Sequence, residues 1–451
     1  MTRDLESRLR AALHDHADGV TPARLTRTLD DAVRDDPHTG ARGRRPGQSW
    51  LVAAAAAVVV AAGASGIVLA TRQSSPSPQP VATVTVTPAP TSAPAPAPTP
   101  SPSVTTSAAP GAAAPHEEPR GAIPWAQVGP GWSAASWATS SQAPSATLYL
   151  VSPSGTRYAI GAIPQTGVYD ITPDGRRILT GSNDPNAVLE WDVAAGTSRS
   201  IPLGQQGATY TKPDGKALLT TDLVGTGTRM ERRGLDGSVQ LTFPAETGMA
   251  RLTPDGLDLV AGTTSGLAVY GNATGTLIRT LPAPSGYGSC QVVSWWPDGR
   301  ALTRCALGGN GVANLWLYPL DGSPATALTA AKAASATPFG YQDAWPVSTG
   351  TLVQEGVGCG VGPLAMLTSP GTSQRIAFTL PGFSASTHPV PDPVAVVGDV
   401  AYLLVSTAEC GGAQTRSLVA YDVVTGRSGV LIGPGANGGT AGPVAVIDPS
   451  H

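Results

Sequence analysis

Residues 172–181 read TPDGRRILTG, a tight-turn signature followed at once by a short apolar run. Proline fixes φ at the first turn position, aspartate accepts hydrogen bonds from local backbone donors, and glycine adopts the left-handed conformation that closes a hairpin. The signature recurs three more times, with its prolines 40, 41 and 43 residues apart. Such regular recurrence indicates a repeat architecture. The further copies are Lys212-Pro213-Asp214-Gly215, Thr253-Pro254-Asp255-Gly256 and Trp296-Pro297-Asp298-Gly299.

A second turn glycine lies between successive copies, in segments such as LYLVSPSGTRYAI at residues 148–160 and LVAYDVVTGRSGVLI at residues 418–432. Two hairpins in each period of about 40 residues give four strands per unit, and seven units predict an all-β, seven-bladed β-propeller with four-stranded blades. The 54 glycines and 43 prolines exclude a coiled coil or a helical bundle, because they would interrupt every helix. The seven turn glycines are Gly155, Gly196, Gly237, Gly275, Gly322, Gly371 and Gly426.

The Pro-Asp-Gly turn followed by a short apolar strand resembles the repeat of TolB-type and WD-repeat-like propellers. Leu189-Glu190-Trp191-Asp192 also contains, once, the Trp-Asp dipeptide of the WD repeat. The resemblance covers about 300 residues and implies a propeller domain over residues 125–451. In the last two units, WPVS at 345–348 and VGDV at 397–400 replace the turn signature.

Closure of the ring requires a strand from the end of the chain. The segment from Trp132 to Trp137 supplies one strand before residue 148, which leaves the first blade a strand short. Residues 442–449 read GPVAVIDP and resemble the strand that precedes a Pro-Asp-Gly turn. Because an open sheet edge invites aggregation, we expect this segment to complete the first blade as its innermost strand.

Residues 50–70 read WLVAAAAAVVVAAGASGIVLA, 21 positions without a charge. As an α-helix they would cover the hydrocarbon core of a bilayer, about 30 Å thick. Three arginines at 42, 44 and 45 precede the run and only Arg72 follows closely, so we predict a single-pass cell-membrane protein with a cytoplasmic N-terminus and the propeller outside. A cleaved signal ending at Ala62-Gly63-Ala64 is the alternative, although 49 residues precede the apolar run.

The segments on either side of this span differ in composition. Residues 1–49 carry two apolar stripes, Leu5-Leu9-Leu13 and Leu25-Leu29-Val33, which predict short amphipathic helices in the cytoplasm. These helices either dock a partner or form a charged, mostly disordered leader. Residues 71–124 are rich in Pro, Ala, Ser and Thr and predict a disordered linker. The layout of anchor, linker and propeller resembles a common class of actinobacterial membrane proteins.

Four cysteines fit an oxidising location outside the membrane. Cys290 and Cys305 flank the Pro297-Asp298-Gly299 turn almost symmetrically, so a hairpin sets them opposite each other. Cys359 and Cys410 occupy Gly-rich connections at the same point of consecutive blades, and we expect them to form a second disulfide. Four free thiols in a reducing compartment are the alternative, and a zinc site would need a C-x-x-C spacing that the sequence lacks.

No G-x-S-x-G, S-x-x-K, H-E-x-x-H, G-x-G-x-x-G or phosphate-loop motif occurs in the sequence. We therefore assign no catalytic residue, no cofactor and no metal site, and the net charge of −3 argues against a nucleic-acid partner. The aspartates of the turn signature are interpreted as turn residues. A carboxylate pair assembled from distant blades stays open, because a ring can bring any two loops together.

The links between units lengthen after residue 281, and loops on a rigid scaffold often carry function. We expect these loops and both Gly-Cys connections to lie on one face. Their exposed aromatic and polar residues form a binding patch in one interpretation, and in the other the aromatics only hold the loops down by packing. The candidate ligand-binding residues are Tyr287, Phe339, Tyr341, Asp343, Phe383, His388 and Asp392.

The first functional expectation is a monomeric, non-catalytic binding or scaffolding propeller whose partner is a protein or an envelope glycan. The second is an extracytoplasmic hydrolase or lyase with its site on the same loop face. The third is a transmembrane sensor whose cytoplasmic helices report ligand occupancy. Paired carboxylates or a histidine facing the channel would favour the enzyme, whereas a flat, aromatic, uncharged face would favour binding.

Overall fold

The computed structural model describes residues 116–448 except for the short stretches 165–166, 205–206, 225–226, 245–249, 308–311, 330–339, 357–360, 370–371, 377–389, 407–414 and 434–438. The expected cytoplasmic segment, the expected membrane span at 50–70 and most of the expected linker lie outside the described residues. Within the described part of the chain, no helix has the length and apolar character needed to cross a membrane.

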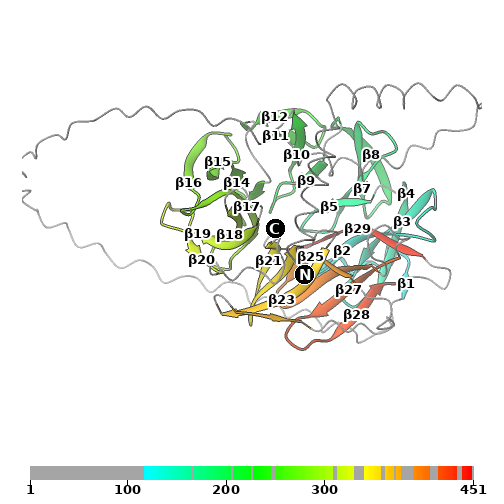
Figure 1. Ribbon diagram of the computed structural model, residues 1–451. Coiled ribbons are helices and arrows are strands. Elements are labelled where there is room, and N and C mark those ends of the chain that lie inside the picture. Colours follow the sequence, from blue (N-terminus) through cyan, green and yellow to red (C-terminus); the bar gives the residue numbers. More distant parts are fainter. Residues whose placement is uncertain are drawn as a thin grey trace, which may run out of the picture. The chain divides into compact units, whose positions relative to one another are not determined.

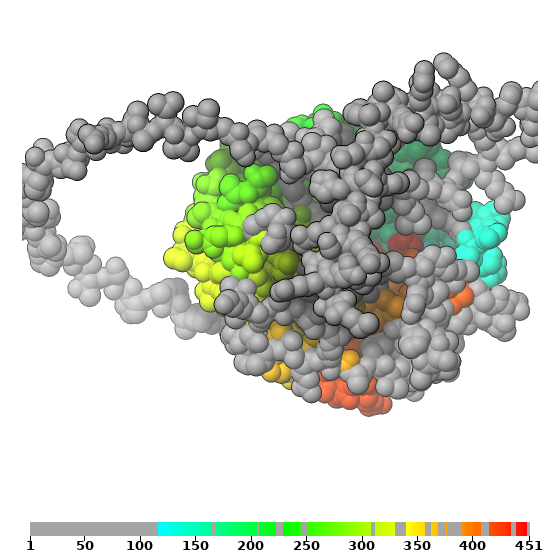
Figure 2. All heavy atoms as spheres, viewed as in Figure 1, coloured from blue at the N-terminus to red at the C-terminus, as the bar shows by residue number. Residues whose placement is uncertain are grey.

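The described strands form seven sheets arranged as blades around a central axis (Figure 1). The predicted all-β, seven-bladed propeller with four-stranded blades is therefore confirmed. In blades 2 to 7 the strands follow chain order, and the first strand of each blade lies nearest the axis. In the same view, Figure 2 shows the green and yellow blades across the ring from the cyan part of blade 1.

Blades 2, 3 and 4 each begin with the hairpin that carries a Pro-Asp-Gly turn. Blade 2 consists of β5 (Val168–Ile171), β6 (Arg177–Gly181), β7 (Ala187–Asp192) and β8 (Thr197–Pro202). Blade 3 consists of β9 (Gly207–Tyr210), β10 (Ala217–Val224), β11 (Gly227–Gly234) and β12 (Val239–Thr242). Blade 4 consists of β13 (Ala250–Leu252), β14 (Asp258–Thr263), β15 (Gly266–Gly271) and β16 (Leu277–Pro282).

Blades 5, 6 and 7 keep four strands although the last two lack the turn signature. Two-residue turns replace it, since Val347 pairs with Gly350 and Val397 pairs with Val400. Blade 5 consists of β17 (Tyr287–Trp295), β18 (Ala301–Leu307), β19 (Ala313–Tyr318) and β20 (Thr326–Ala327). Blade 6 consists of β21 (Tyr341–Val347), β22 (Gly350–Gly356), β23 (Val361–Ser369) and β24 (Thr372–Arg375). Blade 7 consists of β25 (Val390–Val397), β26 (Val400–Ser406), β27 (Arg416–Asp422) and β28 (Ser428–Ile432).

Blade 1 joins strands from both ends of the propeller. From the axis outward they are β29 (Thr440–Val446), β2 (Ser133–Ala138), β3 (Ser145–Val151), β4 (Arg157–Pro164) and β1 (Glu117–Glu118). β29 pairs antiparallel with β2, with Val446 opposite Ser133 and Ala441 opposite Trp137, so the expected closure of the first blade is confirmed. β1 pairs in parallel with β4, so the sheet of blade 1 includes Glu117 and Glu118.

Two short 3₁₀ turns, η1 (Arg120–Ala122) and η2 (Trp125–Gln127), connect β1 to β2. The buried apolar side chains of the described residues fall into seven clusters, and each cluster is shared by two neighbouring blades. Tyr210 of blade 3, for example, packs with Leu179 of blade 2. Each blade therefore buries its apolar surface against its neighbours, as the repeat architecture requires.

The turn chemistry inferred from the sequence is confirmed. The glycines of the four Pro-Asp-Gly turns have φ between 60° and 87°. Asp174 Oδ1 accepts hydrogen bonds from the Arg176 backbone N–H at 3.0 Å and from Thr172 Oγ1 at 2.6 Å, and the aspartates of the other three turns accept equivalent backbone bonds. These carboxylates hold turns, as expected.

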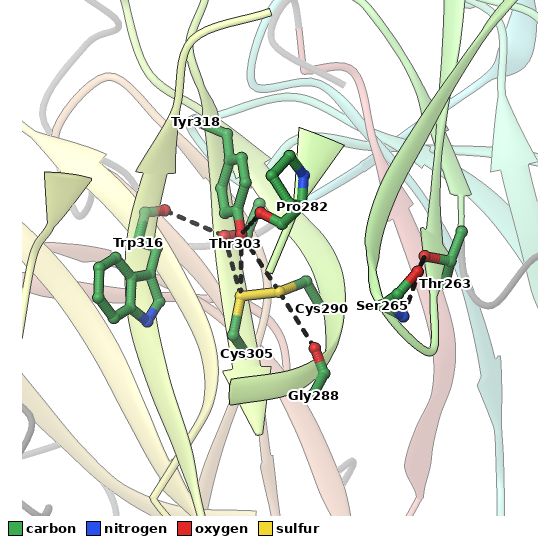
Figure 3. The surroundings of a disulfide bond; sticks show 9 residues. All are labelled: Thr263, Ser265, Pro282, Gly288, Cys290, Thr303, Cys305, Trp316 and Tyr318. Carbon is green, nitrogen blue, oxygen red and sulfur yellow. Dashed lines mark hydrogen bonds between the residues drawn. A yellow bond between two sulfur atoms is a disulfide. The ribbon is translucent and has the colours of Figure 1, made fainter. Parts of the chain in front are cut away.

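A disulfide links Cys290 of β17 to Cys305 of β18, which lie directly opposite each other in the sheet (Figure 3). This confirms the pairing expected from their positions around the turn. The Tyr318 hydroxyl lies 3.5 Å from Cys290 Sγ and donates a hydrogen bond to the Pro282 carbonyl of blade 4 at 3.1 Å. The expected Cys359–Cys410 bond lies outside the described residues.

Candidate functional site

A pocket of about 200 Å³ lies where inner strands end, at one mouth of the central channel that propeller blades surround. Three of its prolines belong to Pro-Asp-Gly turns of consecutive blades. The turns of these blades meet there because β5, β9 and β13 run in the same direction and each ends at its turn. The lining residues are Pro130, Pro173, Lys212, Pro213, Pro254, Ile447 and Asp448.

Blade 1 supplies the rest of the wall. Gly131 N–H donates to the Ile447 carbonyl at 2.9 Å, and Ile447 N–H donates to the Trp132 carbonyl at 2.7 Å. These bonds continue the pairing of β2 with β29 and bring Pro130 beside Ile447. The pocket therefore joins residues from the start and the end of the propeller with the turns of blades 2, 3 and 4.

Lys212, which lines the pocket, also links blade 3 to blade 2. Its ammonium donates to Asp170 Oδ1 at 3.0 Å and to the Ile171 carbonyl at 2.8 Å. Asp170 Oδ2 accepts the backbone N–H of Tyr210 at 2.7 Å. Because these bonds already compensate its charge, Lys212 contributes mainly its alkyl stem to the pocket.

Arg251, a charged residue of an inner strand, interacts electrostatically with carboxylates of other blades. Arg251 of β13 is partly buried, and this burial lowers the pKa of its guanidinium, while the carboxylates of Asp343 and Asp448 act in the opposite direction. Its Nε donates to the Val292 carbonyl of β17 at 3.3 Å. Arg251 thus lies within electrostatic reach of Asp448, which lines the pocket, and of Asp343 in blade 6.

Two of the predicted site residues, Asp343 and Asp392, occupy equivalent positions in neighbouring blades. Each is the third residue of an inner strand, in the neighbouring blades 6 and 7. Burial raises the pKa of Asp343, Arg304 and Arg251 oppose this rise, and the Asp392 carboxylate adds to it. Burial also raises the pKa of Asp392, against a hydrogen bond from Gln354 and the charge of Arg416.

The two predicted tyrosines do not form an exposed aromatic patch. Tyr341 is the first residue of β21, is 2% exposed and packs with Val293 and Leu302 of blade 5, so its expected place in an exposed loop is corrected. Tyr287 begins β17, lies edge-on to Trp316 with ring centroids 5.1 Å apart, and accepts a hydrogen bond from Asn314 Nδ2 at 3.0 Å. Both positions fit the packing interpretation. Phe339, Phe383 and His388 lie outside the described residues.

The pocket residues and Arg251 were not singled out as site residues in the sequence. The signal for Pro173, Pro213 and Pro254 was present, since the turn signature repeats in register and a ring brings equivalent turns to one face. Pro130 and Arg251 have no comparable signal. Among the described residues, no group of three or more His, Cys, Asp or Glu side chains is placed to hold a metal ion.

No protein-family model and no curated protein matches this sequence. Among solved structures, the chain is similar to the β-propeller domain of the trilobed protease from Pyrococcus furiosus, at 15% identity and a TM-score of 0.44, over 65% of this chain and 91% of that one. It is also similar to TolB from Acinetobacter baumannii, at 16% identity and a TM-score of 0.37, over 54% of this chain and 62% of that one.

An uncomplexed acylaminoacyl peptidase from Pyrococcus horikoshii is similar at 11% identity and a TM-score of 0.44, over 64% of this chain and 48% of that one. This chain thus spans about half the length of that peptidase. At these identities the likenesses concern the propeller fold alone.

Proposed function

We propose that this protein is a non-catalytic binding or scaffolding propeller whose ligand is a protein or a cell-envelope component. Residues 50–70 would anchor it in the cell membrane as a single-pass helix, with the N-terminus in the cytoplasm and the propeller outside. The observation that carries the binding role is the pocket at the channel mouth, which is lined by four prolines and Ile447.

The composition of this pocket suits recognition. Proline rings lose no side-chain freedom when a ligand contacts them, so the apolar walls are preformed. Asp448 places one hydrogen-bond acceptor among these walls, and a few polar groups in an apolar pocket orient a ligand. The ammonium of Lys212 is held by Asp170 and the Ile171 carbonyl, so this residue offers apolar contact rather than a free charge.

The test compares two prolines at equivalent turn positions. Pro254 lines the pocket, whereas Pro297, in the turn of blade 5, does not, and both are exposed. The full-length chain, purified in detergent, is used to capture components of a solubilised cell-envelope fraction. We expect Pro254→Glu to lose the captured component and Pro297→Glu to retain it, because only the first places a charge in the pocket. Equal capture by the two variants would contradict the proposed site.

The pair of Asp343 and Asp392 favours a second candidate, an extracytoplasmic hydrolase or lyase. A carboxylic acid whose pKa is raised by burial is suited to protonate a leaving group while a second carboxylate accepts a proton. In this candidate, turnover of a ligand would be lost in Asp343→Asn while its capture persists. The third interpretation, a transmembrane sensor, stays a prediction, since residues 1–49 lie outside the described residues.

A further inference from the structure

Residues 116–131 form a strap that runs from the outer edge of blade 1 to the pocket at the channel mouth. The strap begins with β1, the outermost strand of blade 1 (Figure 1). It then passes through η1 and η2. It ends at Pro130 and Gly131, and Pro130 is one wall of the pocket. One continuous segment therefore connects the edge where the chain enters the propeller with the candidate binding site.

The outer end of the strap is held by a small number of polar contacts. The Arg157 N–H donates to the His116 carbonyl at 2.9 Å, and the Tyr149 hydroxyl donates to Glu117 Oε2 at 3.1 Å. Arg120 Nη1 donates to the Ile160 carbonyl at 3.2 Å, and its guanidinium lies against Gly196 in the β7–β8 turn of blade 2. The strap thus bridges blades 1 and 2.

The inner end is held by the bond from Gly131 N–H to the Ile447 carbonyl at 2.9 Å and by side-chain packing. The Arg176 guanidinium lies over the Trp125 ring, 4.7 Å from its centroid. Val128 packs against Gly175 of the first Pro-Asp-Gly turn. Ile123, at 5% exposure, joins the core shared by blades 1 and 2.

These attachments are weaker than the ladders that hold the ring. Neither 3₁₀ turn has a side-chain cap at its start, and β1 shares a two-residue pairing with β4. By contrast, β10 and β11 pair over eight residues. Segments with few hydrogen bonds and little buried apolar surface open at lower free energy than core strands. Residues 116–130 can therefore lift while Gly131 stays bonded to Ile447 and the seven blades stay closed.

We propose that the strap is a gate of the channel-mouth pocket. When it lifts, Pro130 leaves the wall and Ile447 becomes accessible; when it lies down, the wall is complete. A ligand that fills the pocket contacts Pro130 and so favours the closed strap, because it binds one of two states better than the other. This inference rests on the proposed binding role only for the last step, since the gate itself needs no ligand.

The experiment measures access to the pocket with N-ethylmaleimide on the full-length chain. Ile447→Cys places a thiol under the strap, and Leu281→Cys places one at the same 3% exposure, in the core between blades 4 and 5. Peptide mapping by mass spectrometry separates these thiols from the native cysteines. We expect the thiol of Ile447→Cys to react faster than that of Leu281→Cys. Adding Arg120→Ala and Trp125→Ala should raise the reaction rate at position 447 several-fold and leave the rate at position 281 unchanged.

A lock variant tests the same gate in the opposite direction. A Cβ built on Gly175 lies 3.8 Å from Val128 Cβ, within the range for a disulfide. Compared with its own reduced form, which carries the same substitution of the turn glycine, oxidised Val128→Cys with Gly175→Cys should show slower hydrogen exchange of the strap amides and unchanged exchange of β22. The gate is refuted if the strap amides already exchange as slowly as the ring, or if removing Arg120 and Trp125 raises both thiol rates equally.

Neither experiment uses a ligand, and this keeps the two proposals separable. Failure of the gate leaves the comparison of Pro254→Glu with Pro297→Glu intact. Failure of capture leaves the accessibility measurements intact.

Discussion

Burial and nearby positive charges have opposite effects on the pKa of the Asp343 carboxyl. Burial favours the protonated form, the guanidinium groups of Arg304 and Arg251 favour the ionised form, and Asp392 again favours the protonated form. The net result is a raised pKa, so the folded protein holds a proton there more tightly than the unfolded chain does. Asp298 is the opposite case, because a hydrogen bond from the Arg300 side chain lowers its pKa.

This difference predicts opposite pH dependences for two asparagine variants. From the unfolded value near 3.8 up to its raised folded pKa, Asp343 binds more protons in the folded state, so its contribution to the free energy of unfolding falls as pH rises. Relative to wild type, Asp343→Asn should therefore gain stability between pH 3 and pH 7, and Asp298→Asn should lose it, as measured by urea denaturation. A stability difference between Asp343→Asn and wild type that does not change with pH over this range would contradict the raised pKa of Asp343.

At the scale of single elements, the β17–β18 hairpin is braced by the disulfide and, through Tyr318, by a bond to the Pro282 carbonyl of blade 4. Its two half-cystines are 15 residues apart in sequence. Closing a loop of this size in the unfolded chain corresponds to a stabilisation of about 3 kcal/mol in the chain-entropy account.

Replacing both cysteines, Cys290→Ala with Cys305→Ala, should lower the free energy of unfolding by about 3 kcal/mol. The measurement is urea denaturation of the full-length chain, with and without a reducing agent. A reducing agent should lower the free energy of unfolding of the wild type to that of the variant. It should not lower that of the variant through this bond, because the variant lacks both cysteines. Equal midpoints for the two proteins under oxidising conditions would show that the bond adds nothing to stability.

The elements that the sequence predicted correctly are those with local chemistry of their own. The Pro-Asp-Gly turns and the hairpin glycines act within four residues, so the hairpins of the first five blades could be recognised directly. β21 and β25 were harder to recognise, because each contains proline, which argues against a strand interior. From the sequence, Tyr341, Asp343 and Asp392 are expected in the lengthened links between units, whereas each belongs to an inner strand.

In the candidate site, too, the sequence indicates local turn chemistry but not the contacts between blades. The pocket prolines Pro173, Pro213 and Pro254 were recognised as turn residues, but their common wall depends on the curvature of the ring. Asp343 and Asp392 were selected for their polarity alone, and their interaction arises because two inner strands place them at the same position. No local pattern encodes such contacts between blades.

At the scale of the whole molecule, the ring is held by seven shared cores and is closed by the pairing of β29 with β2. β29 also contributes Ala445 to the core shared with blade 2 and Val446 to the core shared with blade 7. Loss of this one strand would therefore weaken two junctions at once and leave the inner edge of β2 unpaired.

Deletion of residues 440–451 should abolish cooperative unfolding and cause self-association, since an unpaired inner edge offers a template for another chain. Urea denaturation and light scattering after size exclusion measure the two effects. Deletion of residues 449–451, which follow β29, is the matched control and should behave as wild type. A monomeric, cooperatively folding chain without residues 440–451 would show that the closure is dispensable.

Blade 1 takes its outer strands from the beginning of the propeller and its innermost strand from the end. During translation, β2 leaves the ribosome more than 300 residues before its partner exists. While the residues between these two strands are being synthesised, the inner edge of β2 has no partner strand and is open to pairing with another nascent chain.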